Sequence, residues 1–275
     1  MCRWVAYSGA PITLEGLLYA PSHSLIDQSL NSKLGVETTN GDGFGAGWYT
    51  DGQPGVYHSA NPAWNDRNLR QLSGHIESSM FLAHIRASTG TPVQETNCHP
   101  FTYQNWMWMH NGAIDGFARI KRDLVLAVDP ELYPSITGST DSEIMFFLAL
   151  TLGLRDDPPA AVARMAGLIE SIGKEHGIEH PLQMTIAVSD GVRLWSFRYS
   201  TVRQSRSLFY STDVATLRGL HPDHPMLAKV PDGARLIVSE PLGDLEGAWN
   251  QVPEGAYGLI SADGDMMAPF HPVAP

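Results

Sequence analysis

The order of strand-like and helix-like segments constrains the fold of this chain most strongly. Patterns typical of strands dominate up to about residue 110, helical periodicity follows over 113–176, and strand patterns return after residue 180. This order suits two packed, mainly antiparallel sheets with helices on their outer faces. We therefore predict one four-layer αββα domain of the α+β class, and the 275 residues are enough to bury its core.

Local patterns predict the individual elements. Strands are expected at 2–8, 44–50, 55–59, 80–88, 106–110, 183–189, 193–199, 207–211, 234–239, 251–252 and 256–260. Helices are expected at 61–78, 113–128, 142–154 and 160–176, with a helical turn within 12–19. Gly9-Ala10-Pro11 is expected to end the first strand, and residues 25–40 to be irregular.

A glycine run leads into the strand predicted at 44–50. Gly41, Gly43, Gly45 and Gly47 occupy every second position. The spacing superficially resembles a phosphate-binding loop, but no Lys-Ser/Thr pair and no helix follow, so we predict a turn that enters a strand. Glycines at alternate strand positions let another backbone or a ligand approach closely.

Cys2 directly follows the initiator methionine and is small enough for that methionine to be trimmed. The new first residue would carry both a thiol and a free α-amine, and such an amine has a pKa of about 7.7–8. One residue would then supply nucleophile and base, as in enzymes with an N-terminal nucleophile. The alternative is that Cys2 is a small apolar residue at the start of a strand.

Further polar residues stand where predicted elements begin or end. They are Arg86, Ser88 and Thr89 at the end of the strand at 80–88, Asn111 and Gly112 after the strand at 106–110, and Asp141 at the start of a helix. Structural roles are open for each of them: an ion pair for Arg86, a turn for Asn111-Gly112, and the first helical turn for Asp141.

Composition excludes several classes of protein. There are 18 Lys plus Arg against 29 Asp plus Glu, which gives a net charge of −11. An acidic chain argues against nucleic acid or an anionic membrane as a main partner and fits a small-molecule substrate or a basic protein. Two cysteines exclude a disulfide framework. No signal peptide or membrane span is recognisable, so a cytoplasmic protein is expected.

Four segments together resemble the class II glutamine amidotransferases. They are Cys2, His84-Ile85-Arg86-Ala87-Ser88-Thr89, His110-Asn111-Gly112-Ala113-Ile114 and Ser139-Thr140-Asp141-Ser142-Glu143. The glutaminase domains of that family are N-terminal nucleophile hydrolases. Asn40–Gly45 and Asn97–Phe101 look like the single-domain branch, which includes the γ-glutamyl amidase of ergothioneine biosynthesis. The resemblance implies a single glutamine amidotransferase type-2 domain over residues 2–275.

The resemblance also implies a role for each candidate residue. Cys2 would attack the side-chain amide of glutamine or of a γ-glutamyl compound, and its α-amine would act as base and then as acid. Asn111 and Gly112 would offer N–H groups to the oxyanion. Arg86 would bind the α-carboxylate and Asp141 the α-ammonium, with Ser88 and Thr89 beside the substrate. No cofactor and no metal are implied.

Other functions stay open at this point. The chain could be an ammonia-donating glutaminase subunit of a separate synthetase, and it could form a homo-oligomer. It could be a catalytically silent module that binds glutamine. A metalloenzyme would have to use Cys98, His99, His84 and His110, which lack a recognised zinc spacing. Apart from this alternative we expect the three histidines to pack or hydrogen-bond within the sheets and Cys98 to be an inert buried thiol.

Overall fold

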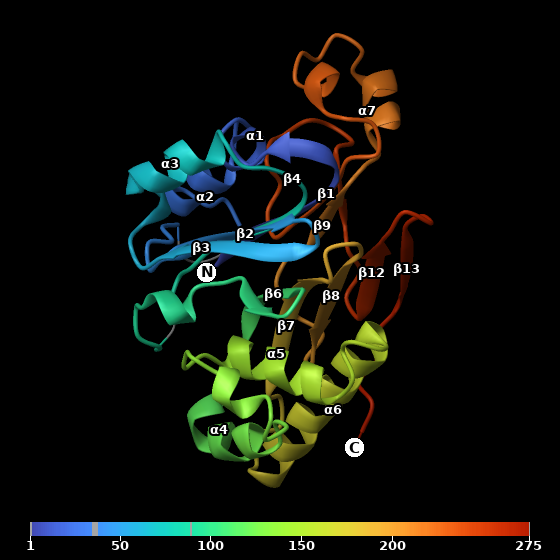
Figure 1. Cartoon of the computed structure of the whole chain (residues 1–275). Coiled ribbons are helices and arrows are strands. Elements are labelled where there is room, and N and C mark those ends of the chain that lie inside the picture. The colour runs from blue at the N-terminus through green and yellow to red at the C-terminus, as the bar shows by residue number, and fades with distance from the viewer. Residues whose placement is uncertain (1, 35–37, 89, 275) are drawn as a thin grey trace.

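Two antiparallel sheets form the centre of the molecule, a computed structural model that describes residues 2–34, 38–88 and 90–274 (Figure 1). The seven-stranded sheet has the order β11 (Trp249–Gln251), β9 (Phe209–Ser211), β10 (Arg235–Val238), β1 (Arg3–Thr13), β4 (Glu77–Ile85), β2 (Phe44–Thr50) and β3 (Gln53–Ser59). The six-stranded sheet has the order β13 (Met266–Pro269), β12 (Ala256–Ile260), β8 (Leu194–Ser200), β7 (Leu182–Ser189), β6 (Trp106–Ile114) and β5 (Phe101–Tyr103).

Helices cover the outer face of each sheet. The α-helices are α1 (Glu15–Leu18), α2 (Leu25–Leu30), α3 (Arg67–Ser73), α4 (Phe117–Leu126), α5 (Asp141–Thr151), α6 (Pro158–Glu175) and α7 (Val214–Leu220). In Figure 1, α1 to α3 lie on the seven-stranded sheet and α4 to α6 on the six-stranded sheet, while α7 projects at the top. Short 3-10 turns lie at Ala63–Asn65, Glu95–Asn97, Tyr133–Ser135 and Leu227–Lys229. The predicted four-layer αββα architecture is confirmed.

Strand alternation divides the core into three layers of apolar side chains. Trp4 and Leu82 from one sheet meet Met107 and Met109 from the other between the two sheets. The neighbouring residue Trp108 points the opposite way and stacks on Phe146 of α5. Because side chains alternate along a strand, one run of Met and Trp serves two core layers. Residues 106–109 are all buried in these layers.

Several predicted boundaries are wrong. β1 continues through Gly9-Ala10-Pro11 to Thr13, because a register shift between Ser8 and Ile12 accommodates these residues in its pairing with β4. Helix α2 lies in the stretch expected to be irregular. Its start is fixed by Ser24, whose side chain accepts from the Asp27 N–H in a capping box.

Helical spacing overestimated the length of one helix, and local patterns missed one further helix and two strands. The helix expected at 61–78 is a 3-10 turn followed by α3, which ends at Ser73 because β4 begins at Glu77. Helix α7 and strands β5 and β13 were not predicted. The segment 44–50 is a strand with the predicted bounds.

The register of β1 brings the first residues of the chain to one end of the seven-stranded sheet. Arg3 pairs with Ile85 of β4, and on the other side Val5 pairs with Val238 of β10. Residues just before β1, just after β4 and just after β10 therefore lie side by side. Within the described ranges no helix has both the length and the apolar composition needed to cross a membrane.

Candidate active site

Cys2 lies at this end of the seven-stranded sheet, beside the residues that follow β4. Its Sγ lies 3.3 Å from the backbone nitrogen and 3.4 Å from the carbonyl oxygen of Ala87. Burial raises the pKa of the Cys2 thiol, and the Ala87 N–H and the positive charges of Arg86 and Arg3 lower it by less. The thiol is therefore protonated at neutral pH and needs a base before it can act as a nucleophile.

Asn111 reaches Cys2 from the opposite sheet. It lies on β6, is 3 % exposed, and donates from Nδ2 to the Cys2 carbonyl oxygen at 2.8 Å. An amide nitrogen carries two hydrogens, so a second N–H remains for another acceptor. The sequence could not place Asn111 at Cys2, because the two residues come from different sheets.

Gly112 follows Asn111 in a backbone conformation with φ of +148°. A Cβ at this position would lie 1.9 Å from the carbonyl oxygen of Gln183 on β7. Only glycine fits there, since any side chain would force β6 and β7 apart. The turn that the dipeptide Asn111-Gly112 suggests by itself is absent, because both residues belong to strand β6.

Arg86 is buried under the segment that follows it. Its guanidinium donates from Nη1 to the Asp42 carbonyl oxygen at 3.2 Å and from Nη2 to Thr91 Oγ1 at 2.5 Å and Ser88 Oγ at 3.1 Å. The Ser88 backbone nitrogen donates to Asp42 Oδ2 at 2.7 Å. Ser88 thus holds Arg86 in place, and Thr89 lies outside the described residues.

Asp141 joins the first turn of α5 to β6. Its Oδ2 accepts from the backbone nitrogen of Ile114 and its Oδ1 from that of Ser142, both at 2.8 Å. The helix cap itself is Thr140, whose side chain accepts from the Glu143 N–H. Asp141 is partly exposed and lies at the end of the strand that carries Asn111 and Gly112.

The sequence matches the class-II glutamine amidotransferases over residues 20–273. The chain belongs to this family. It is 33 % identical to the probable glutamine amidotransferase DUG3 of Saccharomyces cerevisiae over 98 % of this chain and 84 % of that protein. It is 28 % identical to the gamma-glutamyl-hercynylcysteine sulfoxide hydrolase of Mycolicibacterium smegmatis, over 92 % of this chain and 93 % of that one.

Solved structures agree with this assignment. A glutamine aminotransferase class-II domain protein from Silicibacter pomeroyi superposes with a TM-score of 0.74 at 32 % identity, over 99 % of this chain and 100 % of that one. The glutamine phosphoribosylpyrophosphate amidotransferase of B. subtilis superposes with a TM-score of 0.63 at 17 % identity, over 98 % of this chain and 49 % of that one. The latter likeness shows the fold alone, and the predicted N-terminal nucleophile hydrolase fold is confirmed.

Three histidines lie around the site of this class-II amidotransferase and are neutral. Burial lowers the pKa of His84 to about 3, lowers that of His99 well below its usual range, and lowers that of His110. The His99 ring lies between the rings of His84 and Phe101, at centroid distances of 4.1 and 4.5 Å. Among the residues placed in the structure, no three His, Cys, Asp or Glu side chains are grouped to hold a metal ion.

The glycine run allows a neighbouring backbone segment to pack closely against β2. A Cβ at Gly45 would lie 2.2 Å from the His99 carbonyl oxygen, and one at Gly43 would lie 2.7 Å from Cys98 Sγ. Gly47 faces Pro100 in the same way. The segment 98–100 therefore packs directly on β2, which explains the alternating glycines without a ligand.

Three polar residues of this site were missed by the sequence analysis. Arg3 Nη1 donates to the Cys2 carbonyl oxygen at 2.9 Å, Glu240 pairs with Arg3, and Asp42 accepts from the Ser88 N–H. Arg3 could have been identified as a site residue from the sequence, because it directly follows Cys2. Nothing local marks Glu240, which lies 237 positions from Arg3 in the chain.

Proposed function

We propose that this chain is a γ-glutamyl amidohydrolase that uses Cys2 as an N-terminal nucleophile. The observation that carries the proposal is the hydrogen bond by which Asn111 of the other sheet reaches Cys2. Gly112 follows Asn111 on β6, Arg86 precedes the residue that contacts the Cys2 thiol, and Asp141 binds the backbone at the end of β6. Membership of the class-II glutamine amidotransferases supports the amide chemistry. The similarity to a γ-glutamyl hydrolase over nearly its whole length supports a γ-glutamyl substrate.

The proposed reaction begins once removal of Met1 has freed the α-amine of Cys2. The Sγ forms a bond to the amide carbon of the substrate, and the thiol proton passes to the α-amine. The carbonyl oxygen becomes an oxyanion that accepts from the free N–H of Asn111 and from Gly112, donors that are each worth about 10²–10³ in rate. The C–N bond then breaks, and the α-ammonium returns its proton to the leaving nitrogen.

Water completes the cycle by attacking the γ-glutamyl thioester. The C–S bond breaks, the substrate leaves as a γ-carboxylate, and the thiol of Cys2 is restored. In this proposal Arg86 pairs with the α-carboxylate of the substrate and Asp141 with its α-ammonium. Ser88, which supports the guanidinium of Arg86, and Thr89 are further residues proposed to bind the substrate.

The proposal extends to the organisation of the protein. Residues 2–275 form one amidotransferase domain, which is supported by the superposition on a structure of similar extent. A cytoplasmic location stays part of the proposal, since both cysteines are free, as is usual where thiols are kept reduced. The second candidate function is a glutaminase subunit that passes ammonia to a separate synthetase, supported by relatives named as amidotransferases.

Intact mass and product release test the proposal together. The untagged protein is expected to lack Met1, to release ammonia from glutamine or glutamate from γ-glutamyl amides, and to gain one adduct on Cys2 with 6-diazo-5-oxo-norleucine. The variant Cys2→Ala should release neither ammonia nor glutamate and should gain no adduct. Turnover of glutamine alone would favour the ammonia-donating subunit. Glutamine binding without turnover, unaffected by Cys2→Ala, would instead identify a silent binding module.

A further inference from the structure

The carbonyl group of Cys2 is held by two donors. Asn111 Nδ2 and Arg3 Nη1 lie 2.8 and 2.9 Å from the Cys2 oxygen. Once Met1 is removed, a single peptide bond joins Cys2 to the chain, and chain ends fray unless they are tied down. These two hydrogen bonds fix the backbone of Cys2, while the Ala87 backbone contacts its thiol.

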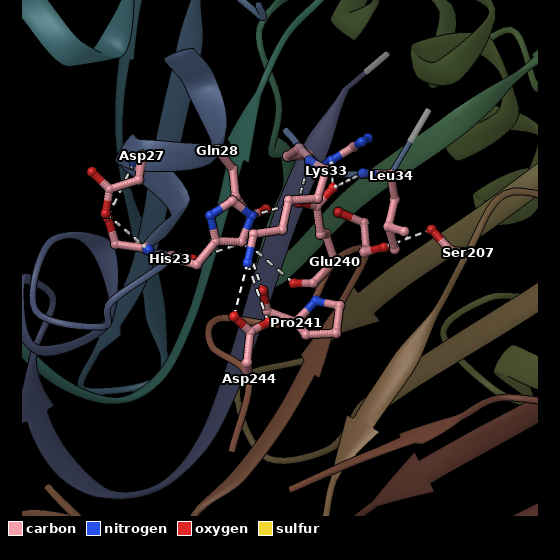
Figure 2. A network of polar contacts seen from close by, with 12 residues as sticks. His23, Asp27, Gln28, Lys33, Leu34, Ser207, Glu240, Pro241 and Asp244 are labelled. Carbon is pink, nitrogen blue, oxygen red and sulfur yellow. Dashed lines mark hydrogen bonds and ion pairs between the residues drawn. The ribbon is translucent and has the colours of Figure 1, made fainter. Parts of the chain in front are cut away.

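Glu240 holds Arg3 in turn. Glu240 (Figure 2) lies two residues after the end of β10 and is 1 % exposed. Its Oε2 lies 2.7 Å from Arg3 Nε. Arg3 is equally buried, so both charges of the pair are removed from water. A buried pair of this kind is strongly destabilised when one partner is removed, because the other charge is left uncompensated.

The same carboxylate also accepts hydrogen bonds from residues 23–34, which are far from Glu240 in the sequence. Its Oε1 accepts from His23 Nε2 at 2.5 Å and from the Lys33 N–H at 2.8 Å, and its Oε2 accepts from the Leu34 N–H at 2.9 Å. Figure 2 shows these groups converging on Glu240, with the Lys33 side chain directed to Asp244 instead. Glu240 thus links the nucleophile to the segment that follows α2.

The carboxylate of Glu240 must be ionised to do this. Burial raises its pKa, but hydrogen bonds from His23, Lys33 and Leu34 and the charge of Arg3 outweigh burial and leave the pKa lowered. An ionised carboxylate can only accept hydrogen bonds, so His23 must donate to Glu240 from a protonated Nε2. An amide in place of the carboxylate would turn an NH₂ group against one of these donors.

We propose that Glu240 is a positioning residue for catalysis, which acts on Cys2 through Arg3. Glu240 fixes the guanidinium of Arg3, and that guanidinium fixes the Cys2 carbonyl and with it the geometry of attack. The inference rests on the proposed role of Cys2 as the nucleophile. Displacement of a reacting group by about 1 Å costs on the order of 10²-fold in rate, so loss of one of two anchors should be measurable.

Two variants test the inference by different routes. Glu240→Gln removes the charge and one acceptor, whereas Arg3→Lys keeps a cation beside Glu240 but loses the planar fork that contacts both Glu240 and Cys2. For both we expect kcat per active site to fall by about tenfold or more, with KM for the substrate changed less than about threefold. The active sites are counted by the Cys2 adduct with 6-diazo-5-oxo-norleucine, whose rate of formation should fall with kcat.

Counting active sites separates positioning from folding. A purely structural Glu240 would reduce the number of sites that react but leave kcat per reacting site at the wild-type value, and this result would overturn the inference. Glu170→Gln is the matched control, because Glu170 lies on the outer helix α6 and accepts from Tyr199. A wild-type protein without turnover or adduct would refute the proposed function and the inference together.

Discussion

His84 Nε2 lies 2.9 Å from Oδ1 of Asn111, and this contact fixes which end of the Asn111 amide faces Cys2. The Asn111 oxygen only accepts, so His84 must carry its hydrogen on Nε2. The amide nitrogen is then directed to the Cys2 carbonyl. His84 is fully buried and its pKa is lowered to about 3, so this arrangement persists across the neutral range.

Replacement of His84 by leucine should release the Asn111 amide. We expect His84→Leu to lower kcat for γ-glutamyl hydrolysis by roughly 10–100-fold, because one oxyanion donor is no longer oriented. Stability should fall by about 1–3 kcal/mol, since the buried Asn111 oxygen loses its donor. Steady-state kinetics and urea denaturation measure the two effects. His84→Gln, which keeps a donor, should recover part of kcat, and an equal loss in both variants would contradict this role.

Stability should depend on pH through the buried histidines. Their pKa values in the folded state lie below the ordinary value of about 6.5, so below that pH the unfolded chain binds more protons. The free energy of unfolding should therefore fall as pH drops from about 6.5 towards 3, by up to about 1.4 kcal/mol per pH unit for each histidine. Urea denaturation at several values between pH 5 and 7.5 measures this slope.

His99→Phe should reduce the pH dependence of the free energy of unfolding by the contribution of one histidine. The His99 ring is 4 % exposed and lies against two other rings, so phenylalanine can replace it in volume and shape. Within the described structure neither ring nitrogen of His99 has a hydrogen-bond partner, so the loss of polarity should cost little at pH 7.5. An unchanged slope below pH 6.5 would show that His99 is protonated in the folded protein.

The carboxylate of Asp141 should determine substrate affinity. Asp141→Asn removes the negative charge and leaves one acceptor oxygen, where the carboxylate uses one oxygen for the Ile114 N–H and the other for the Ser142 N–H. We expect KM to rise by about 10–100-fold, because a hydrogen bond to a charged group is worth about 1.5–3 kcal/mol. Thr140→Ala removes the cap of α5 and should lower stability by about 1 kcal/mol without changing KM. A rise in KM for both variants would indicate that KM depends on the structure at the start of α5 and not on the charge of Asp141.

Gly112 should not tolerate a side chain. In Gly112→Ala the new methyl group would meet the Gln183 carbonyl oxygen, and we expect turnover to fall by more than about 10²-fold as the oxyanion donors move. Gly52→Ala is the matched control, since Gly52 also has a positive φ but a Cβ there meets no atom within 4 Å. That control should lose about 1–2 kcal/mol of stability and keep its turnover.

Elements that carry strong local signals could be predicted from the sequence. The segment 44–50 is bounded by glycines and by Asp51-Gly52, and its bounds are as predicted. The predictions failed where tertiary pairing overrides local preference. Gly9-Ala10-Pro11 reads as the end of a strand, yet β4 continues to pair with β1 beyond the bulge. Strand β13 has a weak pattern of its own and is formed by pairing with β12.

The sequence by itself determined the family and the types of residue that the chemistry needs. Cys2, Arg86, Asn111, Gly112 and Asp141 stand in recognisable local segments, because each role that we propose demands one kind of residue next to a strand or helix end. Such local patterns survive in the sequence and can be recognised without a structure.

Only the tertiary structure decided how these residues are held. Glu240 reaches Arg3 from the far end of the chain, and His84 meets Asn111 across two sheets. Such contacts depend on sheet order, register and packing, which no local pattern encodes. Burial then sets the charge of each group: it lowers the pKa of His84 from the ordinary value of about 6.5 to about 3 between the sheets.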